Sequence, residues 1–365
     1  MTASEIIKII EEDFPLSLQE SYDNSGLCSG DTNTEITGIL CCIDVTSEVI
    51  DEAIDKKANF IISHHPLIFQ GIKSVTTKTL TGQLLLKAIK NNIVLYAAHT
   101  NIDNLSIGVN HKICSILGLT DCKILLPMAD KLSKLVVFVP NSHINNVRQA
   151  IFEAGAGVIG KYDCCSFSSD GYGTFRAGEG TNPFAGKPGM VHTEPETRLE
   201  TILPAWLAPK VVNAIIKAHP YEEVAYDLYP MKNQFTLAGA GMIGDFNTPL
   251  KLSSLLSILR EKFQAQGIRY TGNTEKNIKK VAVCGGSGSF LIGEAKKQQA
   301  DVFITGDVKY HQFFEADNSL SIIDIGHYES EQFTKDIFYE LLMKKISKFA
   351  VHLSEINSNP IKYYS

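Results

Sequence analysis

Two patterns of hydrophobic and polar residues alternate along most of this chain. Short, continuous apolar runs are typical of strands that are buried on both faces of a parallel sheet. Between them lie longer segments in which apolar residues recur every three or four positions, as in amphipathic helices. Up to residue 126 these patterns predict strands at 36–43, 59–63 and 93–98, and helices at 4–13, 46–57 and 79–91.

Local signals at the ends of these segments agree with the periodicity. Pro15 is placed to end the first helix, because proline disrupts a helix interior. Thr46 or Ser47 is placed to cap the second helix, since a hydroxyl can accept a hydrogen bond from an amide of the first turn. The alternation of strand and helix predicts an α/β sheet with a large parallel component.

The middle of the chain has a different pattern. Gly, Ser and Pro are frequent from 166 to 190, a stretch too long for an ordinary connection, so we expect a mobile or functional loop. Around it we predict strands at 135–139 and 224–229 and helices at 144–154 and 208–218. This arrangement is similar to a small ferredoxin-like α+β unit.

After about residue 237 the first pattern returns. It predicts strands at 281–284, 301–305, 321–325 and 349–353, and helices at 250–263, 290–298, 310–315 and 330–346. We therefore predict a discontinuous α/β domain with a largely parallel sheet, formed by residues 1–126 and 233–365, and an inserted ferredoxin-like domain formed by residues 127–232.

Composition narrows the class of protein. The chain has 365 residues, 44% of them hydrophobic, and a formal net charge of −6. Its longest basic runs are pairs such as Lys279-Lys280, which disfavours a nucleic-acid partner because phosphate binding requires clustered Lys and Arg. No apolar stretch approaches the ~18 residues of a membrane-spanning helix, and the first residues do not resemble a secretory signal. We expect a cytoplasmic protein with no membrane partner.

The eight cysteines include the adjacent pairs Cys41-Cys42 and Cys164-Cys165, but no C-x-x-C motif. Disulfide frameworks belong to short secreted chains, and structural zinc sites use the C-x-x-C spacing. We therefore interpret these cysteines as reduced, mostly buried thiols.

Potential metal ligands follow several predicted strands. In open α/β sheets, ligands bind at the carboxyl ends of the strands, so side chains placed there can meet. His327 and Glu331 are four residues apart and can share one helix face. The full set at strand ends is His64 and His65, His99 with Asp103, Asp307, and His327 with Glu331.

These side chains favour metal binding. Adjacent residues of a strand point to opposite sides, so His64 and His65 can diverge at its end and suit two metals better than one. A carboxylate such as Asp103 can bridge two cations. Imidazole and carboxylate together suit Zn, Fe, Mn, Co or Ni, among which the residues do not select. Two cations ~3.5–4 Å apart would activate water and stabilise negative charge on oxygen.

Several neighbours are candidates for catalysis. His99, Asp307 and His311 could take part in proton transfer or support the ligands. Alternatively, Asp307 caps a helix, while Tyr310 and His311 pack locally. For His99 the choice is between a hydrogen-bond partner for Asp103 and a buried core residue.

Two glycine motifs have different interpretations. Residues 239–244 match G-x-G-x-x-G, but turn residues follow instead of a helix, so we do not interpret them as a dinucleotide site. Residues 285–289, GGSGS, lie between a strand and a helix. Their backbone N–H groups could bind phosphate, or Ser289 could simply cap the helix.

Six short motifs, in order along both ends of the chain, carry a resemblance to a known family. They are DNSGL from Asp23, SHHPLIF from Ser63, HTNID from His99, TGDVKYH from Thr305, GHYESE from Gly326 and NPIKY from Asn359. Together they resemble the motifs of the GTP cyclohydrolase 1 type 2 homologs, also called the NGG-interacting-factor-3-like proteins. Tyr22 stands where many members have Trp, which replaces one aromatic residue with another.

This resemblance implies a dinuclear metal centre and a toroidal homohexamer, a trimer of dimers, with the metal sites facing its interior. Asp103, Glu331 or both would bridge the metals. The middle domain is similar to the PII- and CutA-type insert of the longer bacterial members, on the residues HPYEE from His219 and AYD from Ala225. The implied metal ligands are His64, His65, Asp103, His327 and Glu331.

The leading hypothesis is a metal-dependent hydrolase in which metal-activated water attacks a nucleotide-like substrate. The family name implies GTP, with water adding to the imidazole carbon of the purine and formate leaving. The alternative is a non-catalytic hexamer that binds metal for structure, storage or sensing, with the insert as a regulatory module. Nucleic-acid binding inside the ring is disfavoured by the acidic net charge.

Overall fold

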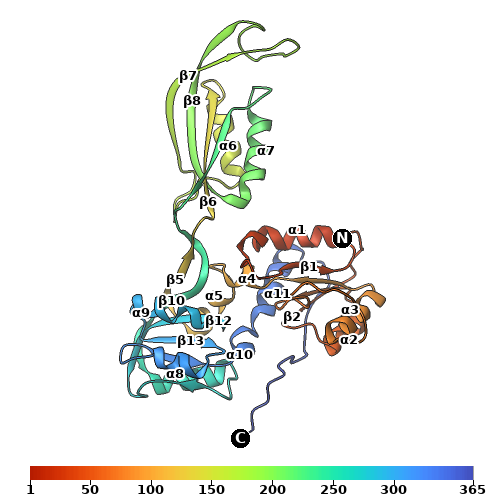
Figure 1. Ribbon diagram of the computed structural model, residues 1–365, viewed down its shortest axis with the longest axis vertical. Coiled ribbons are helices and arrows are strands. Elements are labelled where there is room, and N and C mark those ends of the chain that lie inside the picture. The colour runs from red at the N-terminus through yellow and green to blue at the C-terminus, as the bar shows by residue number, and fades with distance from the viewer. Residues whose placement is uncertain (365) are drawn as a thin grey trace. The chain divides into compact units, whose positions relative to one another are not determined.

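A computed structural model describes residues 1–364. These residues form two compact units: unit 1 consists of residues 1–127 and those from 237 onward, and unit 2 of residues 128–236. Figure 1 shows the helices and strands of each unit. Among residues 1–364, no helix is both long enough and apolar enough to cross a lipid bilayer.

Unit 1 contains two sheets, where the sequence predicts one. The first sheet has the strand order β1-β4-β3-β2-β15. Strands β2, β3, β4 and β15 are parallel, and β1 pairs with β4 in the antiparallel direction. These strands are β1 (Gly26–Ser29), β2 (Ile39–Cys42), β3 (Phe60–Ser63), β4 (Val94–Ala97) and β15 (Val351–Leu353).

The second sheet of unit 1 has the order β11-β14-β13-β12-β10-β5. Its centre, β12-β13-β14, is parallel, whereas β10 and β11 pair with it in the antiparallel direction. Both sheets are therefore mixed. The strands are β5 (Thr120–Met128), β10 (Phe235–Lys251), β11 (Arg269–Tyr270), β12 (Asn277–Ser287), β13 (Val302–Gly306) and β14 (Ser321–Asp324).

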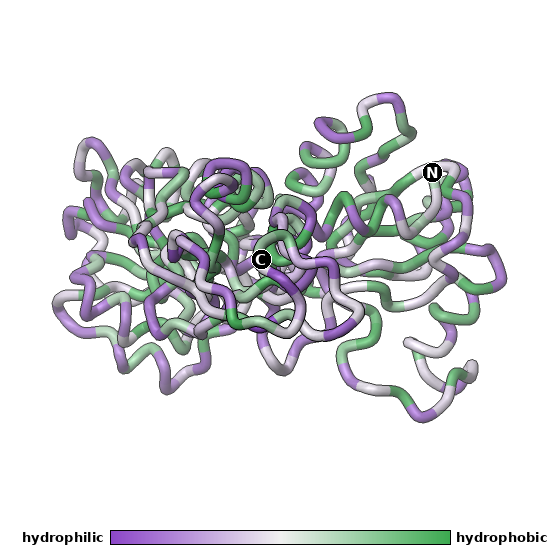
Figure 2. The backbone as a smooth tube through the Cα atoms, turned by 90° about the horizontal axis from the view of Figure 1, so that it is seen from above, coloured by the Kyte–Doolittle hydropathy of each residue, from purple (hydrophilic) through white to green (hydrophobic). Residues whose placement is uncertain are grey.

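The hydrophobic clusters of unit 1 explain why its strands have continuous apolar sequences. One cluster contains residues of both sheets, among them Phe60, Tyr96, Val281 and Ile304. The remaining apolar side chains of the first sheet pack on α2 and α3, and those of the second sheet pack on α9. Since both faces of both sheets are buried, periodicity cannot assign a strand to one sheet or the other. Figure 2 shows the hydrophobic stretches of the chain inside the molecule and many hydrophilic outer loops.

The helices begin where the sequence provides caps. At the start of α1 (Ala3–Asp13), Thr2 and Glu5 form a capping box. Thr46 caps α2 (Ser47–Asp55) by accepting a hydrogen bond of 3.3 Å from the amide of Val49, one of the two predicted alternatives. The other helices of unit 1 are α3 (Leu80–Lys90), α4 (Thr100–Asp103), α5 (Val109–Leu117), α8 (Leu252–Lys262), α9 (Ile292–Lys297), α10 (His327–Glu331) and α11 (Thr334–Lys345).

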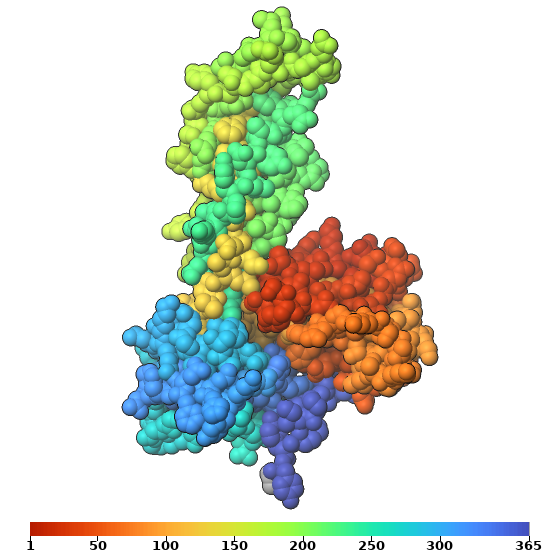
Figure 3. Space-filling model, in the orientation of Figure 1, coloured from red at the N-terminus to blue at the C-terminus, as the bar shows by residue number. Residues whose placement is uncertain are grey.

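The two ends of the chain are joined within the first sheet. Strand β15, near the C-terminus, pairs in parallel with β2, so that Leu353 is opposite Cys41. Figure 3 shows the C-terminal segment against the N-terminal segment of unit 1. The predicted helix at 330–346 is interrupted after α10, so that α10 is short and ends at Glu331.

Unit 2 has one antiparallel sheet, with the order β7-β8-β6-β9. Its core contains Leu135 and Leu199 of the sheet, Ile151 of α6 and Ile215 of α7. In chain order the elements are β6 (Leu132–Pro140), α6 (Ile144–Glu153), β7 (Ser166–Arg176), β8 (Val191–Pro204), α7 (Ala208–Ala218) and β9 (Tyr226–Met231).

The predicted loop at 166–190 is wrong for its first half. Residues 166–176 form β7, which pairs with β8 along its whole length. Every residue of β7 is exposed or only partly buried. Its sequence therefore lacks the alternation of apolar and polar residues that marks a half-buried strand. Only residues 177–190 connect the two strands.

Candidate metal centre

The ends of β3, α4 and α10 bring five side chains of unit 1 together. His64 and His65 follow β3 directly, and Asp103 is the last residue of α4. His327 and Glu331 are the first and last residues of α10. The residues come from both ends of the chain, because the first sheet supplies the histidine pair and α10 follows β14 of the second sheet.

The ligand atoms of these residues form two groups that share Glu331. One group contains His65, His327 and Glu331, and the other contains His64, Asp103 and Glu331, with the ligand atoms of each group within 4.8 Å of one another. Glu331 Oε2 lies 3.0 Å from His65 Nε2, 3.1 Å from His327 Nε2 and 3.5 Å from His64 Nε2. Of these two groups one contains His65 and the other His64, and Glu331 is common to both, whereas a third group joins His64 and His65 with His99.

Hydrogen bonds from outside the cluster orient its imidazole rings. In each ring Nδ1 is engaged, so Nε2 faces the carboxylates and can act as a ligand. The Nδ1 contacts are His64 to the carbonyl oxygen of Ala98 (3.0 Å), His65 to Asp44 Oδ1 (2.7 Å) and His327 to Asp307 Oδ2 (2.6 Å).

Two atoms of the cluster are buried without a hydrogen-bond partner, His64 Nε2 and Asp103 Oδ1. They lie 3.6 Å apart. An unsatisfied buried polar group costs about 1–3 kcal/mol, and a cation bound by both atoms would remove that cost. Nitrogen and carboxylate oxygen donors of this kind fit a divalent transition metal.

Burial and charge set the protonation of the cluster. Burial lowers the pKa of His64 to about 4. Burial would also lower the pKa values of His65 and His327, but nearby carboxylates, above all Asp44 and Glu331, raise them to about 10 and about 9. Burial would raise the pKa of Glu331, but the surrounding imidazoles hold it well below its usual range. The carboxylates of Glu331, Asp44 and Asp307 thus favour the protonated forms of His65 and His327, and a bound cation would replace those protons.

Asp103 differs from Glu331 in its surroundings. Burial, followed by the negative charge of Glu331, raises the pKa of Asp103 well above its usual value. A neighbouring cation would favour its ionised form. The two carboxylates are thus close enough to repel each other when no positive charge lies between them.

His99 lies beside the cluster and is paired with Asp23, not with Asp103. Its Nδ1 is 2.7 Å from Asp23 Oδ1, and a ring nitrogen lies within 4.8 Å of those of His64 and His65. Asp23 also accepts hydrogen bonds from the amide and hydroxyl of Thr100, at 3.0 and 2.5 Å. Burial opposes the ionisation of Asp23, but the bonds from His99 and Thr100 hold its pKa below the usual range. The result is an oriented Asp–His pair at the edge of the cluster.

The other two catalytic candidates, Asp307 and His311, differ in what they contact. Asp307 contacts His327, so it supports a potential ligand and does not cap a helix. His311 belongs to neither ligand group, and its ring packs near those of Tyr310 and Phe314, with centroids 5.2 and 6.3 Å away. The local-packing interpretation therefore describes His311.

The glycine-rich segment at the end of β12 supports the cluster and is not a free phosphate cradle. The amides of Gly285, Gly286 and Gly288 donate to side chains of Asn110, Ser330 and Thr305, each at 2.9 Å. These backbone donors are consequently engaged within the fold. The motif at 239–244 lies inside strand β10, in agreement with our rejection of a dinucleotide site.

Asp23 and Asp44 are the functional side chains whose roles the sequence analysis missed. Asp44 follows β2 closely, at the same edge of the sheet as His64 and His65. The rule that ligands gather at strand ends could have identified it. Asp23 precedes β1, an antiparallel edge strand, so that rule does not apply to it.

Two exposed aromatic rings lie next to His99. Tyr22 is 64% exposed and Phe69 is 45% exposed. Their centroids are 6.5 Å apart, and the Phe69 ring meets His99 edge-on at 6.0 Å. The cluster is therefore bordered, beside His99, by two exposed aromatic rings whose planes are tilted by 41° to each other.

Comparisons with known proteins agree on one family over the whole chain. The family described as Duf34/NIF3 (NGG1p interacting factor 3) matches residues 1–360. A GTP cyclohydrolase 1 type 2 homolog of Halalkalibacterium halodurans is 41% identical over 363 residues, 98% of each chain. One of Bacillus subtilis is 38% identical and covers 100% of this chain and 99% of its own.

Solved structures show the same similarity. A Bacillus cereus protein described as related to NIF3 is 39% identical, with a TM-score of 0.88, and the match covers 100% of this chain and 99% of the other. A Staphylococcus aureus protein is 30% identical, with a TM-score of 0.78 and the same coverage.

Proposed function

The chain belongs to the Duf34/NIF3 family, as its motifs predict, and we propose that it is a metal-dependent hydrolase acting on a nucleotide-like substrate. The observation that carries this proposal is the pair of ligand groups that share Glu331. The orphaned atoms His64 Nε2 and Asp103 Oδ1 support it further. The relatives named GTP cyclohydrolase 1 type 2 homologs make GTP the first substrate to test.

We assign one divalent cation to each ligand group. His65 and His327 would hold one, His64 and Asp103 the other, and the carboxylate of Glu331 would bridge both. Bound there, the cations would supply activated water and stabilise negative charge on oxygen. Asp44 and Asp307 hold the rings of His65 and His327 in place.

The remaining chemistry comes from groups beside the cluster. We propose that His99, oriented by Asp23 through Nδ1, accepts or donates a proton at its other ring nitrogen, Nε2. Tyr22 and Phe69 offer their faces to a heterocyclic base. The aromatic pair beside His99 supports the proposal that a nucleotide base binds between these rings and the cluster.

The fold of unit 2 and the assembly of the protein are part of the same proposal. The element order β-α-β-β-α-β and the strand order β7-β8-β6-β9 support a ferredoxin-like fold for unit 2. We propose that the protein forms a homohexamer, a trimer of dimers, which its mass in solution would test.

The proposal is tested by measuring, in the same variants, the metal content by elemental analysis and the turnover of GTP. The Glu331→Ala variant removes the shared ligand, so its metal content should fall from about two equivalents to near zero. His327→Ala should retain about one equivalent, and the exposed His111→Ala serves as the matched control. His99→Gln should keep its metal but lose roughly 10²–10⁴-fold in turnover.

The outcomes separate the two functional hypotheses. A wild-type protein that binds no metal under replete conditions would refute the centre. A protein with full metal content that hydrolyses no nucleotide with any of the five metals would instead favour the non-catalytic alternative. Unchanged turnover in His99→Gln would remove the Asp–His pair from the mechanism.

A further inference from the structure

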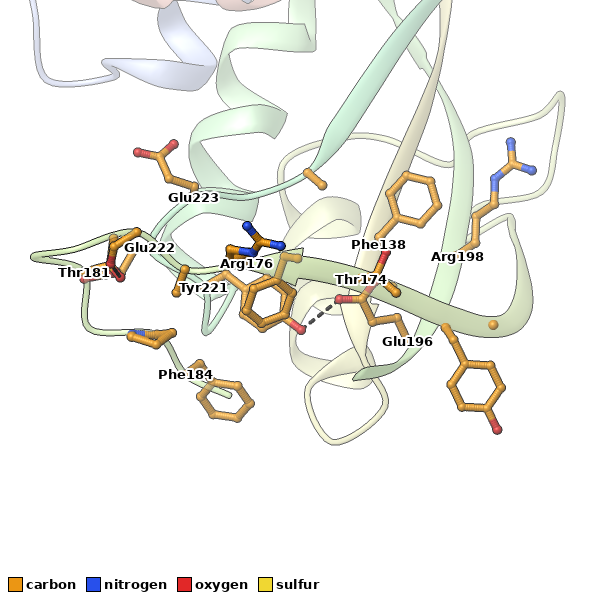
Figure 4. A pocket seen from close by; sticks show the side chains of 18 of the residues that line it. Phe138, Thr174, Arg176, Thr181, Phe184, Glu196, Arg198, Tyr221, Glu222 and Glu223 are labelled. Carbon is orange, nitrogen blue, oxygen red and sulfur yellow. Dashed lines mark hydrogen bonds between the residues drawn. The ribbon is translucent and has the colours of Figure 1, made fainter. Parts of the chain in front are cut away.

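Unit 2 contains a pocket of about 670 Å³ that has no part in the metal centre. Leu199 of β8 packs against the helices, whereas alternate residues of a strand face opposite sides. Glu196 and Arg198 therefore lie on the other face of the sheet, where they line the pocket. Figure 4 shows Glu196 and Tyr221 at its centre and Phe184 at its edge.

Two glycines of β7 leave room beside Glu196. Gly171 is its cross-strand partner, and a Cβ at Gly171 would meet no atom within 4 Å. A Cβ at Gly173 would lie 2.1 Å from Glu196 Oε2, so a side chain there would displace the carboxylate from its present position. The two glycines thus leave a space without side chains next to the carboxylate of Glu196.

Within residues 1–364, only one of the two carboxylate oxygens of Glu196 accepts a hydrogen bond. The residue is 7% exposed, and its Oε1 accepts a hydrogen bond of 2.8 Å from the hydroxyl of Tyr221. Burial raises the pKa of Tyr221, which keeps this hydroxyl protonated as a donor. Among the described residues no group donates a hydrogen bond to Oε2, which is accessible from the pocket that Glu196 lines. A donor from a bound molecule would complete the pair.

Aromatic rings and negative charge surround this oxygen. The ring of Tyr221 lies 5.8 Å from that of Phe175 and 6.1 Å from that of Phe184, between centroids. Besides Glu196, the lining includes Asp170, Glu222 and Glu223, against two guanidinium groups, Arg176 and Arg198. Arg198 is bound to Glu200 at 3.0 Å. Aromatic faces together with carboxylates select a cation.

We propose that this pocket binds a small organic cation, a protonated amine carried on a flat ring. The ammonium group would donate to Glu196 Oε2, and the ring would pack among Phe175, Phe184 and Tyr221. Binding is reversible and involves no covalent step. The proposal is independent of the metal centre, which unit 1 contains.

Calorimetric titration of the full chain with tryptamine tests this site. Indole-3-acetate has the same ring with the opposite charge and should bind at least tenfold more weakly. Glu196→Gln keeps an acceptor for Tyr221 but removes the charge, so tryptamine affinity should fall at least tenfold. Gly171→Val should block the space beside Glu196. Phe184→Ala removes a ring that the loop between β7 and β8 contributes to the pocket, so it should weaken the binding of tryptamine. Glu153→Gln, an exposed change on α6, should have no effect.

Melting curves of each variant establish that unit 2 remains folded. The proposal is overturned if Glu196→Gln binds tryptamine as the wild type does, or if indole-3-acetate binds equally well. It is also overturned if wild-type protein fails to bind tryptamine at about 1 mM. Should Gly171→Val not fold, the Glu196→Gln and Phe184→Ala variants still decide the outcome.

Discussion

Glu331 occupies a space that exists because residue 286 is glycine. Gly286 has a φ of +60°, and a Cβ there would lie 2.2 Å from Glu331 Oε1 and 3.3 Å from His327 Cε1. Its amide also donates to Ser330 of the same short helix. The absence of a side chain at residue 286 thus determines where the shared carboxylate of Glu331 lies.

We expect Gly286→Ala to lower metal affinity at least tenfold, because the new methyl group displaces Glu331 and the backbone is strained. Gly293→Ala is the matched control, since a Cβ on Gly293 in α9 meets no atom within 4 Å. Competition with a chromogenic chelator measures both affinities. Equal affinity in the two variants would contradict the argument.

The segment after β15 has no regular secondary structure. Its side chains contact residues that lie around the candidate metal centre. Ser358 donates to Asp44 Oδ2 at 2.5 Å, and Asp44 in turn holds His65. Tyr363 donates to Glu329 Oε1 at 3.1 Å, as does Asn359 Nδ2. The segment is therefore ordered by side-chain contacts to α10 and to the edge of the first sheet.

Tyr363→Phe should reduce the free energy of unfolding by about 1 kcal/mol, because Glu329 is buried and loses one of its donors. The fully exposed neighbour provides the control: Tyr364→Phe should change it by no more than about 0.5 kcal/mol. Urea denaturation of both variants checks this. A loss of the same size in the two would show that the hydroxyl of Tyr363 contributes no specific stability.

Buried strands were predictable from their continuous apolar sequences, whereas the exposed strands were predictable only in part: β9 overlaps the predicted strand at 224–229, but β7 was predicted as a loop. Strands such as β3 and β13 are buried throughout and have continuous apolar sequences. Strand β7 is exposed, so its pairing with β8 has no hydrophobic signature. The pairing of His99 with Asp23 joins residues 76 positions apart through one hydrogen bond, which no local pattern encodes.

At the scale of the whole molecule, unit 2 is an insertion whose two ends lie close together. Strands β5 and β10 are neighbours in the second sheet, and a Cβ on Gly239 would lie 2.7 Å from the Cα of Pro127. Unit 2 also has a hydrophobic cluster of its own. Domains inserted in this way can fold independently of the chain that carries them.

We expect a chain in which residues 128–236 are replaced by a short Gly-Ser linker to fold and to bind as much metal as the full chain, because unit 1 keeps every proposed ligand. The isolated residues 128–236 should also melt cooperatively. Circular dichroism and elemental analysis test both statements. Loss of metal from the shortened chain, with its secondary structure intact, would show that unit 2 is required for the centre.

The sequence separation of 266 residues from His65 to Glu331 has a consequence for the synthesis of this protein. At roughly 5–20 residues per second, a ribosome releases the histidine pair on the order of ten to fifty seconds before the shared carboxylate. Until then the nascent chain holds only part of the cluster. A chain terminated early, before α10, cannot complete it, so an assembled cluster distinguishes finished chains from fragments.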